Sequence, residues 1–274
     1  MSMRTQWMAA AAALALCALA HGAAAIAQEA APAPIARSPQ ALAFIAGTTK
    51  DCPKCDLHDL DLSRRDFSGA NLAGANLAQV TLVEANLMGA NLTDTDFTES
   101  DLSLANMRQV NLHGAVMHQV TAYLTDLTLA DMTEVYMHSG LLRRARMQRV
   151  NLTGAYLIDS DLREAHLAGA TLTGANLGGS KFDNANLVDL DLRGVNLEVA
   201  DMINADLTGA NLEGAILRQA DLYGANLFET KLKGTDFTEA RLQAANVRGA
   251  NLQDAILKDT MLPNGEFHTG PLTQ

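Results

Sequence analysis

Two cysteines offer the most definite chemistry in the chain. Cys52 and Cys55 have two residues between them, just ahead of a long regular repeat, and the only other cysteine is Cys17 near the N-terminus. In an oxidising compartment, two thiols at this spacing most often form a disulfide. A metal site that also used His58 would lack an evident fourth ligand, and a redox-active pair would lack a surrounding βαβ pattern. We expect a disulfide between Cys52 and Cys55, with metal or redox binding at this pair as the alternative.

A group of aromatic and basic residues near the middle of the chain is a candidate binding surface. Steps of 20 residues bring Tyr136 into line with Tyr156 and Tyr123 into line with Arg143, on a surface otherwise rich in Asp, Asn and Thr. Tyrosine and arginine are enriched where protein interfaces concentrate their binding energy. The sequence leaves two interpretations open, drift of the repeat in the middle of the stack and a protein-binding patch. The patch comprises Tyr123, Tyr136, His138, Arg143, Tyr156 and Arg163.

The carboxylates do not form a catalytic pattern. Asp and Asn recur at regular intervals, and stacked outward amides such as Asn71, Asn91 and Asn111 can bond one another and the backbone. No G-x-S-x-G, P-loop, Rossmann or H-E-x-x-H motif occurs. His118 and His138 would give a metal only two ligands. We expect no enzyme activity, no catalytic residue, no metal site outside the cysteine alternative and no cofactor.

All of these residues lie in a repeat of five. An apolar residue occupies every fifth position from Leu57 to Leu262 without a slip, which gives 42 consecutive pentads. Of these central residues 30 are Leu, six Met, four Phe and one Val, and Ala122 is the only small one. The residue two before the centre is Ala in 23 pentads, and the residue just before the centre is Asp or Asn in 27. Such regularity predicts one continuous architecture that holds the candidate residues in fixed relative positions.

A period of five fits neither an α-helix nor a flat strand. On a helix, five residues advance about 500°, so the centres would spiral around the axis. On a flat strand, the odd spacing would send alternate centres to opposite faces. The conflict disappears if each pentad forms one side of a coil and uses one residue at a corner. The centre and the residue two before it then point inward, and the residue two after the centre lies at a corner where φ > 0 favours Gly. Four sides close a coil of 20 residues, and coils stack about 4.8 Å apart.

These pentads resemble the pentapeptide-repeat family, whose signature is Ala-(Asp/Asn)-Leu followed by two variable residues. Full matches occur at 70–74, 75–79, 90–94, 210–214 and 225–229. The resemblance implies an all-β fold, a right-handed quadrilateral β-helix of about 10 coils at the spacing above. Leu60, Arg65 and Leu190 depart from the small inward residue expected at their positions. Arg65 needs an open end or a partner for its charge.

The two ends of the sequence differ from the repeat. Arg4, an apolar stretch from Met8 to Ala20 and an Ala-x-Ala site predict a secretory signal peptide over residues 1–27, cleaved after Ala27. Its apolar core is too short to cross a bilayer, so we expect no membrane span in the mature chain. Residues 28–51 are expected to form a linker and a short capping helix that begins at Ser38 and Pro39. The β-helix is expected over 52–262 and a C-terminal tail or cap over 263–274.

The charge balance narrows the class of partner. Lys and Arg number 20 against 31 Asp and Glu, which gives a net charge of −11. That acidity argues against nucleic acid or an anionic membrane surface as a direct partner. We expect a periplasmic or secreted, non-enzymatic β-solenoid that acts as a rigid protein-interaction or structural module in the bacterial envelope, with an unidentified protein partner. The resemblance offers an alternative, because some cytoplasmic members of the family resemble B-DNA in size and acidity and bind DNA gyrase.

Overall fold

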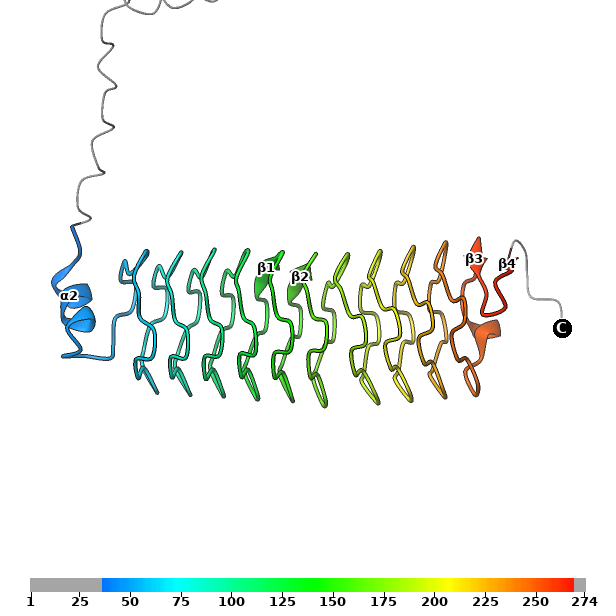
Figure 1. The fold of residues 1–274 in the computed structure, drawn as a ribbon, viewed down its shortest axis with the longest axis horizontal. Helices are drawn as coiled ribbons and strands as arrows, with labels where there is room; N and C mark the ends of the chain where they lie inside the picture. The colour runs from blue at the N-terminus through cyan, green and yellow to red at the C-terminus, as the bar shows by residue number, and fades with distance from the viewer. Residues whose placement is uncertain (1–35, 269–274) are drawn as a thin grey trace, which may run out of the picture. The chain divides into compact units, whose positions relative to one another are not determined.

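The computed structural model describes residues 36–268 (Figure 1). The predicted signal peptide, nearly all of the linker and residues 269–274 lie outside the described residues. Within residues 36–268, neither helix is long and apolar enough to span a membrane. The elements in chain order are helix α2 (Pro39–Ile45), strands β1 (Tyr136–His138) and β2 (Tyr156–Ile158), the 3-10 helix η1 (Leu252–Asp254), and strands β3 (Thr260–Met261) and β4 (Phe267–His268).

Successive coils of the chain are joined by parallel β-bridges between residues 20 positions apart. The series runs from the pair Asp56 and Asn76 to the pair Arg241 and Met261. Among the described residues, only β1 and β2 extend to three paired residues, with Tyr136 opposite Tyr156. Figure 1 shows the coils side by side, each returning to the same position one coil later. The predicted register of four pentads per coil is confirmed.

The interior is lined by two residues of each pentad. The central residue and the residue two before it are buried through most of the repeat, as at Ala90 and Leu92, and are partly buried near its two ends. The corner residue two after the centre has positive φ in every pentad from Lys54 to Gly249. A hydrogen bond such as that from the Ala90 N–H to the Leu87 carbonyl (2.9 Å) closes each regular corner. This is the arrangement of a type II turn, whose third residue needs positive φ.

The recurring Asp or Asn accepts a hydrogen bond from the backbone, as the N–H groups of one pentad show. In residues 90–94, one N–H closes the corner and three bond to carbonyls of the neighbouring coils. The remaining N–H, that of Thr93, has no carbonyl partner and donates to Oδ1 of Asn91 at 3.2 Å. Asp96 accepts from the N–H of Thr98 in the same way, at 2.8 Å. The side chain before the centre therefore satisfies the one backbone donor that the coils leave over.

Buried hydroxyls are also accommodated inside the stack. Thr125 occupies an inward position usually held by Ala, and its Oγ1 donates to the carbonyl of Leu102 in the preceding coil at 2.7 Å. Thr235 and Thr260 make the same bond to residues 23 positions earlier, both at 2.7 Å. A buried hydroxyl is tolerated because it finds an acceptor. Each of these threonines thus adds a side-chain link between coils.

Helix α2 lies against the first coil through aromatic packing. The Ser38 side chain accepts from the N–H of Ala41 at 3.1 Å, and Pro39 occupies the first turn, as expected for a helix N-terminus. Phe44 is fully buried, and its ring stacks on Phe67 with centroids 4.9 Å apart. This contact joins the helix to an inward residue of the coil.

Arg65 finds its partners in the same place. Its guanidinium donates to the carbonyls of Phe44 (2.9 Å) and Ile45 (3.0 Å) at the C-terminal end of α2. It also lies over the rings of Phe44 and Phe67, at 5.8 and 5.1 Å from their centroids. Helix C-termini carry unpaired carbonyls and partial negative charge. The inward arginine therefore bonds the helix to the coil instead of breaking the core.

At the C-terminal end the repeat gives way to a hairpin. Strand β3 pairs antiparallel with β4, with Met261 opposite Phe267. The turn between them follows Pro263, and the N–H of Leu262 donates to the carbonyl of Glu266 at 2.8 Å. The sequence break at Pro263 was predicted, but the antiparallel pairing was not.

Candidate protein-binding surface

The two cysteines occupy regular inward positions of the first coil. Cys52 takes a central position, and the N–H of Cys55 donates to its carbonyl at 3.2 Å, as at other corners. Both side chains are buried, and their sulfur atoms are bonded. The pair bridges one corner of the coil and makes no link to α2. Within the described residues, no group of three or more His, Cys, Asp or Glu residues is placed to hold a metal.

Oxidation of Cys52 and Cys55 to each other in the protein isolated from cells is a prediction with a direct measurement. Mass spectrometry without reduction should find the protein isolated from cells two hydrogen masses lighter than the reduced form, with no thiol open to alkylation at Cys52 or Cys55. A burial this complete leaves a free thiol poorly accessible, so alkylation is done after unfolding. Two alkylated cysteines would rule the disulfide out.

The predicted tyrosine column lies on one side of the coil. Tyr136 and Tyr156 are exposed by 47% and 44%, and their rings stack with centroids 5.3 Å apart and planes 4° from parallel. His138 is exposed beside them, and its Nε2 lies 3.2 Å from Oδ2 of Asp159. The alignment of Tyr136 with Tyr156 that the 20-residue steps predict agrees with the structure, and all three side chains are exposed.

The arginines of the predicted patch lie on the next side and are paired with acids. Arg143 Nη2 lies 2.6 Å from Oε1 of Glu164, and the other oxygen of Glu164 lies 2.6 Å from Nε of Arg144. Arg163 makes two bonds to Asp161, at 2.8 and 2.6 Å. These pairs were not predicted from the sequence. The column is therefore less basic than its arginines alone suggested.

The structure places the predicted residues in two groups on adjacent sides of the coil. Tyr136, His138 and Tyr156 lie on one side of the coil, and Tyr123, Arg143 and Arg163 lie beyond the corner on the next. Among the described residues, no hydrogen bond or ion pair joins the two groups. Tyr123 instead receives a hydrogen bond from Arg144 Nη1 at 3.5 Å. The patch divides into a tyrosine face and an arginine face.

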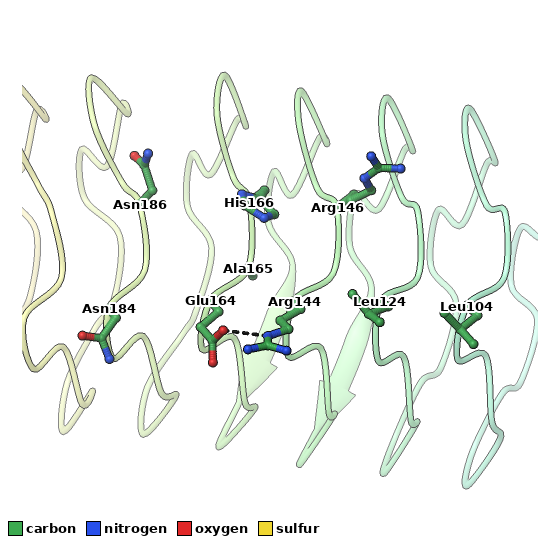
Figure 2. Close-up of a pocket in the computed structure, with 9 residues that line it drawn as sticks. All are labelled: Leu104, Leu124, Arg144, Arg146, Glu164, Ala165, His166, Asn184 and Asn186. Carbon is green, nitrogen blue, oxygen red and sulfur yellow. Dashed lines mark hydrogen bonds and ion pairs between the residues drawn. The ribbon is translucent and has the colours of Figure 1, made fainter.

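The arginine face borders an open groove of about 530 Å³ (Figure 2). Figure 2 shows two rows of side chains that run across successive coils. One row lies at the corner that follows the side with Arg143 and Arg163, and the other row lies on the side after that corner. The corner row changes along the stack from leucine to arginine to glutamate. The groove is lined by Leu104, Leu124, Arg144, Glu164 and Asn184 in the corner row, by Arg146, His166 and Asn186 in the other row, and by Ala165.

The charges around the groove are mutually stabilised. Hydrogen bonds from Arg143 and Arg144 hold the pKa of Glu164 below its usual value, and Glu164 raises the pKa of Arg144. Burial opposes ionisation of Asp126, but hydrogen bonds from Thr128 and Arg108 outweigh it and lower the pKa. The groove therefore holds full charges of both signs at neutral pH.

Several pentads next to this groove lack the Asp or Asn that normally satisfies the leftover backbone donor. Leu141, Arg146 and His166 stand in its place. Among the described residues, no acceptor bonds to the backbone N–H two positions on, at Arg143, Gln148 and Ala168. Unsatisfied donors are tolerated only where water or a ligand can reach them. The sequence shows these three positions directly, among the pentads whose residue before the centre is neither Asp nor Asn, but it does not single them out from the others.

Comparison with known proteins gives the family. The Pentapeptide repeats family matches the chain in eight copies, over residues 55–94, 90–128, 151–189, 160–198, 180–219 and 220–259. No curated protein sequence matches significantly.

Several solved structures are similar to this chain. HetL, a pentapeptide repeat protein involved in heterocyst differentiation regulation in the cyanobacterium Nostoc sp. Strain PCC 7120, is 25% identical, with 83% of this chain and 97% of HetL covered and a TM-score of 0.47. Full-length QnrB1, a plasmid-mediated fluoroquinolone resistance protein, is 16% identical, with 74% and 94% covered and a TM-score of 0.41. A pentapeptide repeat protein of the Arabidopsis thaliana thylakoid lumen is 28% identical over 43% of this chain and 66% of its own, with a TM-score of 0.16.

The family assignment agrees with the coil geometry described above. The matched ranges take in well over half of the chain, and the period of 20, the inward pairs and the positive-φ corners run through them. Membership implies the right-handed β-helix that the sequence resemblance predicted. The chain belongs to the pentapeptide-repeat family.

Proposed function

We propose that this protein is an exported, non-enzymatic β-solenoid that acts as a rigid protein-interaction module in the bacterial envelope. The observation that carries the proposal is the concentration of exposed apolar, aromatic and arginine side chains on the coils of residues 104–166. In these coils the Asp or Asn that bonds the backbone is repeatedly replaced. Giving up such a bond costs about 1 kcal/mol each where no new acceptor replaces it. Retaining these residues against that cost supports a role in binding.

The placement in the envelope is supported by the sequence. Arg4, the apolar stretch from Met8 to Ala20 and the Ala-x-Ala site have the pattern of a secretory signal. A helix α2 that covers the first coil and a disulfide at Cys52 and Cys55 suit a protein that works outside the reducing cytoplasm. We propose that the mature chain begins at Gln28 and is periplasmic or secreted.

Fractionation of cells that express the full chain with a C-terminal tag tests the location. The expected result is recovery from the periplasm or medium, with a mature N-terminus at Gln28. Crosslinking in intact cells followed by purification should then recover an envelope protein, and the triple variant Tyr136→Thr, Tyr156→Thr, Arg143→Ser should lose it. Recovery from the cytoplasm with residues 1–27 still attached would overturn the location. Equal crosslinking by the variant would overturn this binding surface.

The rival function is binding of DNA gyrase by resemblance to DNA. A net charge of −11 favours it, whereas the arginines at residues 143–149 interrupt any uniformly acidic face. The same fractionation separates the two, since a gyrase-binding protein must be cytoplasmic. A gyrase supercoiling assay with the purified chain should show no inhibition if our proposal holds.

A further inference from the structure

We propose that the groove lined by Leu104, Leu124, Arg144 and Arg146 binds an extended acidic protein segment that carries apolar side chains beside its carboxylates. The inference rests on the proposed function as an interaction module and names the site and the class of partner. Three features of the groove converge on that ligand: its leucines, its arginines and its unpaired backbone donors.

The leucines are the first feature. Leu104 and Leu124 are exposed by 48% and 40%, and both occupy corners with positive φ, at 61° and 56°. Leucine is strained in this conformation, which Gly and Asn adopt more readily. The coil requires positive φ at its corners whatever the residue, and an exposed leucine there buries little apolar surface in the fold, so these two side chains are open to a ligand. The two side chains are one coil apart in Figure 2 and form an apolar strip at one end of the groove.

The arginines are the second feature. Four of the seven residues from Arg143 to Arg149 are arginine, in a chain whose net charge is −11. Arg144 is engaged by Glu164, but the side chain of Arg146 is 64% exposed, and its nearest acid is Asp126 at 3.6 Å. Asp126 is shared with Arg108 at 3.4 Å. Arg146 therefore keeps most of its donors for a ligand carboxylate, which it can bind through two parallel bonds.

The backbone donors are the third feature and give the site its chemical logic. In a regular pentad the carboxylate or amide before the centre accepts the N–H two residues on. At this groove Arg146 has replaced that acceptor, which leaves the Gln148 N–H without one among the described residues. A ligand carboxylate beside Arg146 would restore the missing acceptor and pair with the guanidinium at the same time. His166 and the Ala168 N–H repeat the arrangement one coil further on.

The dimensions suit an extended chain. Leu104 and Asn184 lie four coils apart in the corner row, a span of about 19 Å at 4.8 Å per coil. An extended segment covers that distance with about six residues. Its apolar side chains would meet Leu104 and Leu124, and its carboxylates would meet Arg144 and Arg146.

Longer polyanions suit the surface less well. Duplex DNA or an anionic lipid surface would extend beyond the groove and meet the acidic residues that dominate the rest of the chain. Glu164 and Asp126 lie within reach of the groove itself and would repel densely packed phosphates. A short acidic segment avoids most of that repulsion, and the charge of the remaining surface directs it to this one place.

Selection from a random peptide library tests the proposal. A phage-displayed library of random 12-residue peptides is panned on the full-length protein, with counter-selection on the variant Arg144→Ser/Arg146→Ser. The expected result is enrichment of peptides in which Asp or Glu stand among large apolar residues. A fluorescent copy of an enriched peptide should bind wild type with an affinity that falls about tenfold or more in this variant and falls with added salt.

Two further variants serve as matched comparisons. Arg64→Ser/Arg193→Ser removes the same charge from two exposed, acid-paired arginines outside the groove, and it should leave peptide binding unchanged. Leu104→Asn/Leu124→Asn removes the apolar strip but places a residue that tolerates positive φ at each corner. This variant should keep its circular dichroism and its Tm while binding falls about tenfold.

Several outcomes would overturn the inference. They are failure to enrich any peptide, enrichment without acidic residues, or equal binding to wild type and to the groove variants. Saturable binding of a 20-base-pair DNA duplex or of phosphatidylglycerol vesicles that is lost in Arg144→Ser/Arg146→Ser would assign the groove to a polyanion instead. The proposed function as an interaction module would be contradicted by a different result, namely that the wild-type protein crosslinks no envelope protein in intact cells.

Discussion

At the scale of single residues, the stability of this protein depends on where each leftover polar group finds a partner. Asn91 and Asp96 accept the one N–H that the coils leave unpaired, and Thr125 bonds a carbonyl of the coil before it. Arg65 does the same for two carbonyls at the end of helix α2. The first role of these polar side chains is therefore to form hydrogen bonds with the backbone, and not to form a binding site.

Arg65 gives a test of this view. The change Arg65→Ala removes two hydrogen bonds to α2 and the contact with two aromatic rings, and we expect a loss of about 1–3 kcal/mol in the free energy of unfolding. Arg65→Lys keeps the charge but not the planar fork, so it should recover only part of the loss. Urea unfolding measures both, and hydrogen exchange should show the amides of α2 opening first. An unchanged stability in Arg65→Ala would show that the contacts of Arg65 contribute little to holding α2 on the coil.

Asp183 should destabilise the fold at neutral pH. Burial and the nearby carboxylate of Asp201 raise the pKa of Asp183, and one carboxylate oxygen of Asp201 is buried without a partner. A raised pKa of an acid means that its ionisation opposes folding above that pKa, and that the penalty disappears as the pH falls toward the unfolded value. Asp183→Asn should therefore raise Tm at about pH 7 and change it little at about pH 3.

Asp161 supplies the opposite case as a control. Burial disfavours its charge, but hydrogen bonds from Arg163 outweigh burial and lower its pKa. A lowered pKa stabilises the fold above the unfolded value, and that stability is lost as the pH falls through the folded pKa. Asp161→Asn should lower Tm at about pH 7, with a smaller difference below about pH 4. The same sign of change in Asp183→Asn and Asp161→Asn at neutral pH would contradict this account.

At the scale of elements, the repeating unit of the fold is one side of a coil with its corner. Strands β1 and β2 differ from the regular unit. Both strands are longer than the usual single bridge. The corner after β1 lacks the usual closing bond, and the N–H of Gly140 donates to Oγ of Ser160 at 3.2 Å instead. Gly140 stands where an inward Ala is normal. A Cβ there would lie 2.3 Å from Sδ and 2.7 Å from Cγ of Met137.

The pair Gly140 and Met137 should therefore be energetically coupled. Gly140→Ala forces Met137 out of its place in a close-packed core, which costs about 1–3 kcal/mol. In the background Met137→Leu, whose side chain is the usual centre, the same change should cost less by about 1 kcal/mol. Urea unfolding of the four proteins closes the double-mutant cycle. Additive effects would show that Met137 relaxes freely and that the glycine has another cause.

The elements also show how far the sequence alone could lead. The period fixed which residues face inward, the register of 20 and the positive φ at each corner, because these depend only on the spacing of like residues. It also placed Tyr136 beside Tyr156. It did not identify Glu164 as the partner of Arg143, nor Phe44 as the neighbour of Arg65, because those contacts join irregular positions. The hairpin of β3 and β4 was missed for the same reason, as it follows the last regular pentad.

At the scale of the whole described stack, each coil touches only the coil before and the coil after. Stability in such a protein is close to a sum of coil terms and contacts between neighbours. The interior coils have two such neighbours. The last coil is less enclosed, since Leu252, Ala255 and Leu262 are only partly buried there.

The cost of a cavity should therefore depend on its place in the stack. Leu162 is fully buried in an interior coil, and Leu162→Ala should cost about 2–5 kcal/mol. Leu257 occupies the same kind of central position in the last coil, where relaxation is easier, and Leu257→Ala should cost about half as much or less. Denaturant unfolding measures both values. Equal losses would mean that the stack responds as a single uniform body.

The fixed separation of 20 residues between bridged positions has a consequence for how the chain can change length. Removal of 20 residues deletes one complete coil, so every later side keeps its orientation about the axis and only moves along the axis by about 4.8 Å. A deletion of five residues rotates all later sides by a quarter of a revolution about the axis. Side chains that lay on one face of the stack before the deletion then lie on two different faces. Such a protein can therefore gain or lose whole coils while each face keeps its set of side chains. A change of one pentad instead moves the side chains of all later coils to a different face, and so alters the surface that a partner would contact.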